Sequence, residues 1–157
     1  MSPQNPLKPT EGMAPFETRL RTARAVAAPP YVRVSDIEAR LGTRYTVDTL
    51  AALLQRYPQD RFVWLMGADN LIQVNRWHRW RRLFDLVPVA VIDRPGYTYT
   101  ALASRAATAL ASCRRKRAFG RLAQQEPPAW AFVFGFRDWT SSTALRRERP
   151  GGLMVEG

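Results

Sequence analysis

The sequence has 157 residues, of which 46% are hydrophobic and 24% charged, which is typical of one globular domain with a single core. One cysteine, Cys113, excludes an internal disulfide, and one histidine, His78, excludes a metal or catalytic site built on paired histidines. No apolar run reaches the roughly 18 residues that a membrane-spanning helix needs. With a single thiol to oxidise, we expect a soluble, cytoplasmic protein without a membrane partner.

The net charge of +11 comes almost entirely from arginine, since Lys8 and Lys116 are the only lysines. The basic residues are spread along the chain, with one dense run at residues 114–117. The arginine excess fits either the coding composition of the source genome or attraction to phosphate-bearing ligands. The charge alone does not choose between them.

Apolar spacing and Pro/Gly punctuation predict alternating strands and helices after a loop at residues 1–12. Strands are expected over residues 31–37, 62–66, 87–92 and 129–136. Helices are expected over residues 14–28, 46–57, from 67–70 to about 86, and 141–149. Residues 97–128 are a variable connecting region. The alternation predicts an α/β fold with a mostly parallel sheet. We expect one domain over residues 1–149 and a flexible tail over 150–157.

Ligands of such sheets bind at the carboxyl ends of the strands. After the last strand, Ser141, Ser142 and Thr143 bring three hydroxyls to a helix start, and Arg146 follows one turn later. This pattern suits a phosphate, although a plain N-cap with a solvated basic face has the same composition.

Gly67 and Asp69 follow a buried strand, where glycine lets a ligand approach and a carboxylate can bind ribose. A turn glycine and a capping aspartate are the simpler interpretation. Thr46, after Tyr45, is more simply a helix cap. Trp77, among the basic residues at 76–82, could stack on a heteroaromatic ring.

Seven segments, in this order and spacing, resemble bacterial nicotinate-nucleotide adenylyltransferases over nearly the whole chain. They are Ser-Pro-Gln-Asn-Pro-Leu-Lys (2–8), Asp-Ile-Glu (36–38), Tyr-Thr-Val-Asp-Thr-Leu (45–50), Gly-Ala-Asp-Asn (67–70), Trp-His-Arg-Trp (77–80), Arg-Pro-Gly-Tyr (94–97) and Ser-Ser-Thr-Ala-Leu-Arg (141–146). The resemblance implies a Rossmann-like nucleotidyltransferase fold. It also implies transfer of AMP from ATP, with Mg²⁺, to nicotinate mononucleotide, giving deamido-NAD and pyrophosphate in NAD biosynthesis.

The resemblance also implies roles for individual residues. ATP would be bound by Ser141, Ser142, Thr143, Arg146, Gly67 and Asp69. The mononucleotide would be bound by Asn5, Lys8, Tyr45, Thr46, Trp77 and Arg94, with Tyr45 and Thr46 at the nicotinate carboxylate and Trp77 on its ring.

The family's opening strand and Gly-x-Phe-x-Pro-x-His-x-Gly-His loop have no counterpart in the printed sequence, so no catalytic residue is assigned. We therefore expect that the first βα unit is missing and that the true start lies upstream of Met1. A parallel sheet without that strand has an open edge. The 157 residues alone are then expected to aggregate or to be partly molten, with little adenylyl transfer.

Two other functions remain open at this point. Arg114 to Arg117 with the Trp/Arg segment at 76–82 could form a basic nucleic-acid-binding module. Another adenylyl- or cytidylyltransferase of the same fold would share Ser-Ser-Thr-x-x-Arg, and Tyr45, Thr46 and Trp77 are the features that favour a flat carboxylated ring. Specific nucleic-acid binding is not expected, and the oligomeric state is left open.

Overall fold

The computed structural model describes residues 14–27, 31–116 and 119–135, which fall into two compact units. The described part of the first unit ends at Thr49, and the second unit begins at Leu50. The loop expected at 1–12, the last helix at 141–149 and the tail at 150–157 lie outside the described residues. A single domain over 1–149 therefore stays a prediction.

The first unit contains α1 (Phe16–Val26), α2 (Ile37–Leu41) and the start of α3 (Thr46–Arg56). Helices α1 and α3 confirm the two predicted from hydrophobic spacing, and Pro15 stands at the N-cap of α1 as its missing N–H allows. Within α1, Leu20 is the buried residue. The apolar stripe of α3 continues into the second unit, where Leu50 and Leu54 pack in the core.

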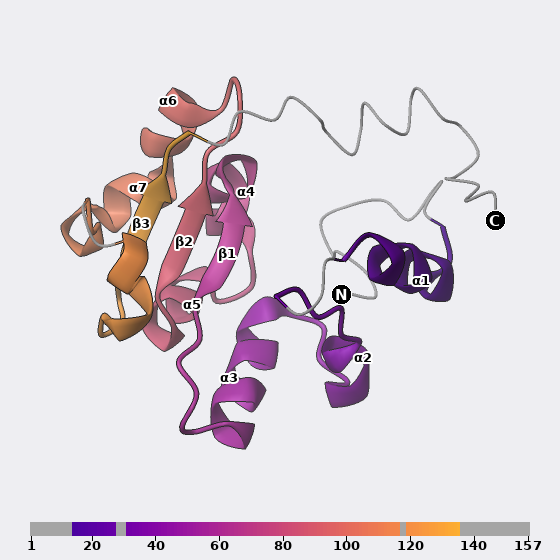
Figure 1. Cartoon of the computed structure of the whole chain (residues 1–157). Helices are drawn as coiled ribbons and strands as arrows, with labels where there is room; N and C mark the ends of the chain where they lie inside the picture. Colours follow the sequence, from indigo (N-terminus) through magenta and orange to yellow (C-terminus); the bar gives the residue numbers. More distant parts are fainter. Residues whose placement is uncertain (1–13, 28–30, 117–118, 136–157) are drawn as a thin grey trace. The chain divides into compact units, whose positions relative to one another are not determined.

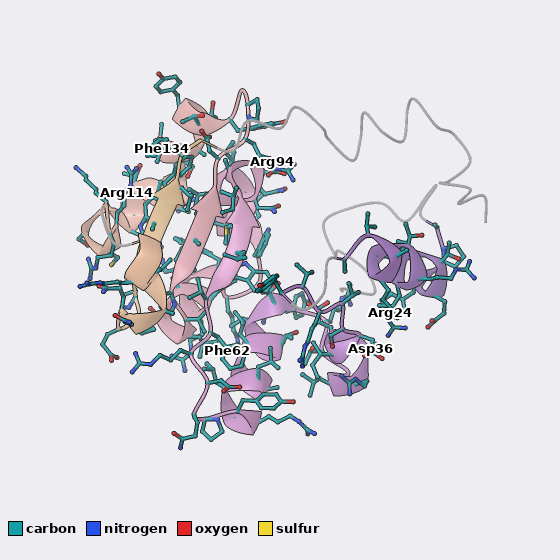
Figure 2. The ribbon with its side chains drawn as sticks, viewed as in Figure 1. Arg24, Asp36, Phe62, Arg94, Arg114 and Phe134 are labelled. Carbon is teal, nitrogen blue, oxygen red and sulfur yellow. The ribbon has the colours of Figure 1, made fainter. Side chains whose placement is uncertain are left out.

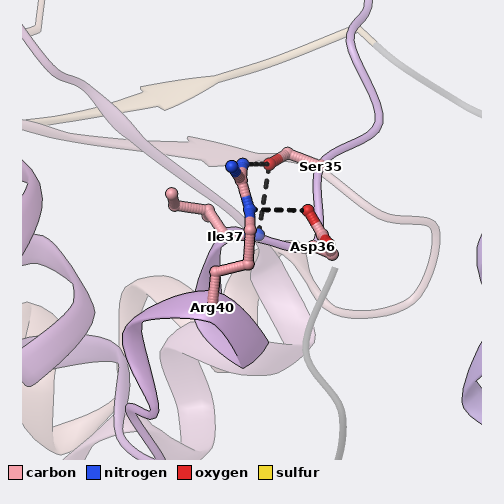
Figure 3. A network of polar contacts seen from close by, with 4 residues as sticks. All are labelled: Ser35, Asp36, Ile37 and Arg40. Carbon is pink, nitrogen blue, oxygen red and sulfur yellow. Dashed lines mark hydrogen bonds and ion pairs between the residues drawn. The ribbon is translucent and has the colours of Figure 1, made fainter.

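The strand predicted over residues 31–37 is wrong, because none of the described strands pairs with this segment and Tyr31 is 93% exposed. Instead α2 begins at Ile37, whose N–H donates to Ser35 Oγ at 3.1 Å. Arg40 adds an ion pair to Asp36, with 3.0 Å between Nε and Oδ1 (Figure 3). Local polar contacts of this kind compete with strand pairing and start a helix.

The second unit is built on a parallel sheet of three strands in the order β1-β2-β3 (Figure 1). The strands are β1 (Trp64–Gly67), β2 (Val89–Ile92) and β3 (Trp130–Val133). Their register is level: Trp64 pairs with Val89 and Val89 with Trp130. Three of the four predicted strands and their parallel arrangement are confirmed; each is shorter than expected, and β1 ends one residue later than predicted.

The helix predicted from 67–70 to about 86 is interrupted. It divides into α4 (Ala68–Gln73), the 3₁₀ turn η1 (Val74–Arg76) and α5 (Trp80–Leu86). Trp77 has extended backbone angles and Arg79 a left-handed φ of 48°. On both sides of the break the apolar residues are buried, so the change of direction lets each half pack on the core.

The connecting region contains four short elements that the sequence did not predict. They are α6 (Thr98–Leu102), α7 (Arg105–Ala109), η2 (Ala111–Cys113) and η3 (Phe119–Gln124). Ser104 caps α7 by accepting the N–H of Ala107 at 3.3 Å. Alanines of α6 and α7 are buried, so their small side chains bring these helices close to α4.

The two faces of the sheet are covered unequally. One face carries Met66, Val91 and Phe132 into the main core, together with residues of α4 to α7. On the other face, Ala90 and Ala131 are covered by Leu122 of η3. Leu65 is level with these alanines but 62% exposed. Among the three described strands, β1 thus has an open edge beside an exposed leucine.

Trp130 ties β3 to the connecting region. Its indole Nε1 donates to the carbonyl of Leu110 at 2.8 Å, and this hydrogen bond is buried. The Arg114 guanidinium lies over the indole, 5.3 Å from the ring centroid. The N–H of Arg115 donates to the Trp130 carbonyl at 2.7 Å. Trp130 therefore combines burial, a hydrogen bond and a cation–π contact.

Within the ranges given above, no helix is both long and apolar enough to cross a bilayer.

Trp130→Phe removes the indole donor and leaves the Leu110 carbonyl buried without it. We expect a loss of about 2 kcal/mol or more in the free energy of unfolding, measured by urea denaturation. Trp64→Phe is the matched control, because the buried Trp64 indole nitrogen has no hydrogen-bond partner among the residues that the structure describes. Equal losses in both variants would contradict this account.

Leu65→Lys places a charge on the open edge of β1, where lysine discourages pairing between chains. We expect a change in unfolding free energy within about 0.5 kcal/mol and less aggregation, measured by light scattering at increasing concentration. Met66→Lys, one residue along and 4% exposed, should lose on the order of 4 kcal/mol. The inference is wrong if Leu65→Lys unfolds the chain as Met66→Lys does.

Candidate functional site

The carboxyl ends of the three strands lie at one edge of the second unit. Gly67, Ile92 and Val133 are level in the register, so the segments that follow them leave the sheet together. Figure 2 shows Arg94 and Phe134 at this edge, just past the ends of β2 and β3. This is the edge at which parallel α/β sheets bind ligands.

Gly67, Asp69 and Arg94 form a compact cluster there. Arg94 Nε lies 3.5 Å from Asp69 Oδ1, and the two side chains are 47% and 30% exposed. A Cβ on Gly67 would overlap Asp69 Oδ1 and come within 3.0 Å of Arg94 Nε. Only glycine therefore leaves room for this ion pair against the backbone. The sequence had named all three residues, and the structure brings them together.

The carboxylate of Asp69 has a hydrogen-bond acceptor that is not satisfied by the described residues. Its Oδ1 is buried and makes no hydrogen bond within the described residues, so the Arg94 guanidinium is its charge partner. A buried carboxylate oxygen without hydrogen bonds is unfavourable. A ligand that donates hydroxyl groups, as a ribose does, would satisfy the carboxylate.

Arg94 belongs to a tight turn between β2 and α6. Tyr97 N–H donates to the Arg94 carbonyl at 3.0 Å, Pro95 occupies the second position and Gly96 the third, with a φ of 80°. These are the features of a type II turn. The turn is closed further by Thr98, whose hydroxyl donates to Asp93 Oδ1 at 2.6 Å.

Asp93 and Thr98 were not singled out from the sequence, although Pro95-Gly96 was a visible turn signal. The dipeptide marks where the chain reverses, but it does not mark which side chains make a contact across the turn. A carboxylate just before the turn and a hydroxyl just after it are suited to that contact.

Trp77 directly follows η1 and is only partly buried, packed against the main core together with Trp80. Both tryptophans therefore contribute part of their surface to the core. Trp80 meets Phe84 edge-on at 6.2 Å, and Arg81 lies 4.9 Å from the Trp80 ring. His78 is exposed and lies in the turn before α5.

Tyr45 and Thr46 lie in the first unit, at the start of α3. The Tyr45 carbonyl already accepts the N–H groups of Asp48 and Thr49, both at 3.1 Å. A further contact, 2.7 Å between the hydroxyls of Thr43 and Thr49, steadies the same turn. The N–H groups of Asp48 and Thr49 are therefore used within the start of the helix, and the backbone role expected for Tyr45 and Thr46 stays a prediction.

Six predicted site residues lie outside the described residues: Asn5, Lys8, Ser141, Ser142, Thr143 and Arg146. In the part that is described, no three His, Cys, Asp or Glu side chains come together as a metal site would need. Asp69 and Asp93 instead pair with Arg94 and Thr98. The described side chains thus provide no cage for Mg²⁺.

Comparison with known proteins gives a cytidylyltransferase-like family model that matches residues 1–148. A probable nicotinate-nucleotide adenylyltransferase of Parvibaculum lavamentivorans is 55% identical over 152 residues, which cover 96% of this chain and 75% of that protein. A protein of the same description from Gluconobacter oxydans is 49% identical over 147 residues, which cover 93% of this chain and 75% of that protein.

Among solved structures, a nicotinic acid mononucleotide adenylyltransferase of Plasmodium falciparum complexed with APC is 12% identical, with a TM-score of 0.49. The match covers 82% of this chain and 56% of that one. The family model and the identities of the bacterial relatives establish that this chain belongs to the nicotinate-nucleotide adenylyltransferases, within the cytidylyltransferase-like family.

Proposed function

We propose that the chain transfers AMP from ATP to nicotinate mononucleotide, releasing pyrophosphate and forming deamido-NAD. The observation that carries the proposal is the cluster of Gly67, Asp69 and Arg94 at the carboxyl edge of the sheet. It offers a carboxylate for hydroxyl groups and a cation for phosphate beside a backbone that a ligand can approach. The bacterial relatives, named for this activity, support the same substrates.

In this proposal each described site residue has one task. Asp69 binds ribose hydroxyls of the ATP side, and Arg94 binds the phosphate of the mononucleotide. Trp77 provides a ring face for nicotinate, since part of its indole stays exposed. Tyr45 and Thr46 offer backbone N–H groups to the nicotinate carboxylate. Ser141, Ser142, Thr143 and Arg146 would hold the ATP phosphates, with Asn5 and Lys8 at the mononucleotide.

The reaction needs no nucleophile from the protein. A phosphate oxygen of nicotinate mononucleotide attacks the α-phosphorus of ATP, and the bond to the bridging oxygen of pyrophosphate breaks. The protein then contributes alignment of the two substrates and charge stabilisation as pyrophosphate leaves. Mg²⁺ would arrive on the phosphates of ATP as part of that substrate.

The activity is tested by incubating the chain with Mg-ATP and, in separate reactions, nicotinate mononucleotide, nicotinamide mononucleotide or phosphopantetheine, with separation of the products by chromatography. We expect product from the nicotinate substrate at least about tenfold faster, since only that ring carries a carboxylate. Equal turnover of the two, or turnover of phosphopantetheine instead, would assign another transferase of the fold. Salt-sensitive binding of RNA or DNA without turnover would favour the nucleic-acid module.

Gly67→Ala tests the cluster directly, because the added methyl group overlaps the Asp69–Arg94 ion pair. We expect kcat/KM to fall by about tenfold or more, equivalent to about 1.4 kcal/mol in transition-state stabilisation. Gly120→Ala is the matched control, because nothing lies within 4 Å of a Cβ at Gly120. Unchanged kinetics in Gly67→Ala would remove the cluster from the site.

A further inference from the structure

The turn that carries Arg94 is fixed at both ends. On the sheet side, Asp93 N–H donates to the carbonyl of Val133 at 3.0 Å, so Asp93 continues the pairing of β2 with β3. On the helix side, Thr98 is the first residue of α6, and Ala101 N–H donates to the Tyr97 carbonyl at 2.8 Å. Four residues, 94–97, therefore have to turn between two anchored positions.

A single side-chain contact joins the two anchors. The Thr98 hydroxyl donates to the Asp93 carboxylate at 2.6 Å, and this hydrogen bond is partly buried. The distance lies in the range of short hydrogen bonds to a charged acceptor, which are roughly twice as strong as neutral ones. Because Thr98 and Asp93 are five residues apart, the bond closes the loop and restricts the turn inside it.

The restriction acts on Arg94, the first residue of the turn. Its Nε is directed to Asp69 on α4, and α6, which holds Thr98, also packs against α4. The ion pair uses Nε, so within the described part of the chain the two terminal nitrogens of the guanidinium are left for a ligand. A guanidinium held in place before binding loses less conformational freedom when the ligand arrives.

We infer that Asp93 and Thr98 are a positioning pair, whose hydrogen bond holds the 94–97 turn so that Arg94 is directed toward Asp69 before the phosphate of the mononucleotide binds. Neither residue needs to touch the substrate. Their effect passes through Arg94 alone, and in this respect the inference rests on the proposed function of Arg94.

The test compares Thr98→Val, which keeps the shape of the side chain but loses the hydroxyl, with Thr98→Ser, which keeps it. Thr100→Val is the matched control, since Thr100 lies on the same short helix and is exposed. Calorimetric titration of the full chain with nicotinate mononucleotide, and separately with Mg-ATP, gives the two dissociation constants. Thermal unfolding of each variant shows whether stability has changed.

We expect Thr98→Val to weaken binding of the mononucleotide by about tenfold, with ATP binding unchanged. Thr98→Ser should restore most of the affinity, and Thr100→Val should match the unaltered chain. In an Arg94→Ala background Thr98→Val should have no further effect, because the positioned group is gone. Equal weakening for both substrates, or an effect that persists without Arg94, would show a general structural role and overturn the inference.

A second measurement needs no ligand and separates this inference from the proposed function. The Nε–H signal of Arg94 in a nitrogen-15 spectrum is identified as the one lost in Arg94→Lys, and its exchange with water is measured. Thr98→Val should speed that exchange several-fold, while Thr100→Val should not. If the chain does not bind the mononucleotide but the exchange responds, the proposed function fails and the positioning contact stands. If the exchange does not respond, the positioning pair is wrong whatever the chain binds.

Discussion

Level parallel pairing of β1, β2 and β3 is the constraint on which the candidate site depends. Gly67, Ile92 and Val133 end their strands at the same height, so the residues that follow them come out at one edge. Asp69 and Arg94 can form an ion pair only because of this alignment. A shift of β2 by one residue would reverse the side chains facing the core and move the start of the Arg94 turn along the edge.

The core explains why the alignment is held. Met66, Val91 and Phe132 share one face and are buried with α4 to α7, whereas the opposite face carries small alanines that Leu122 covers. The large side chains can be buried only in one register. The uneven covering leaves Leu65 exposed on β1, so this weakly protected surface and Gly67 of the candidate site belong to the same strand.

Much of the fold could be predicted because its signals are local. Continuous apolar runs gave the three parallel strands, and helical spacing gave α1 and α3. Residues 31–37 have the alternating pattern of a strand, but a strand also needs a neighbouring strand to pair with, and none of the described strands pairs with this segment. The Ser35 hydroxyl instead accepts the N–H of Ile37, where α2 begins. For the site, the residues named from the family pattern include Gly67, Asp69 and Arg94. The Asp93–Thr98 contact joins two side chains across a turn, and no spacing rule in one sequence identifies it.

The broken helix around Trp77 shows how a departure from a simple pattern can serve the site. In a continuous helix, Trp77 would follow Leu71 and Val74 at steps of three and join them on the buried face. Its extended backbone, with the left-handed Arg79 two residues later, takes it off that path. The indole is then packed against the core along part of its surface and open along the rest. A ring held in this way loses little freedom when a flat ligand stacks on it, and this is the property that the proposed nicotinate contact requires.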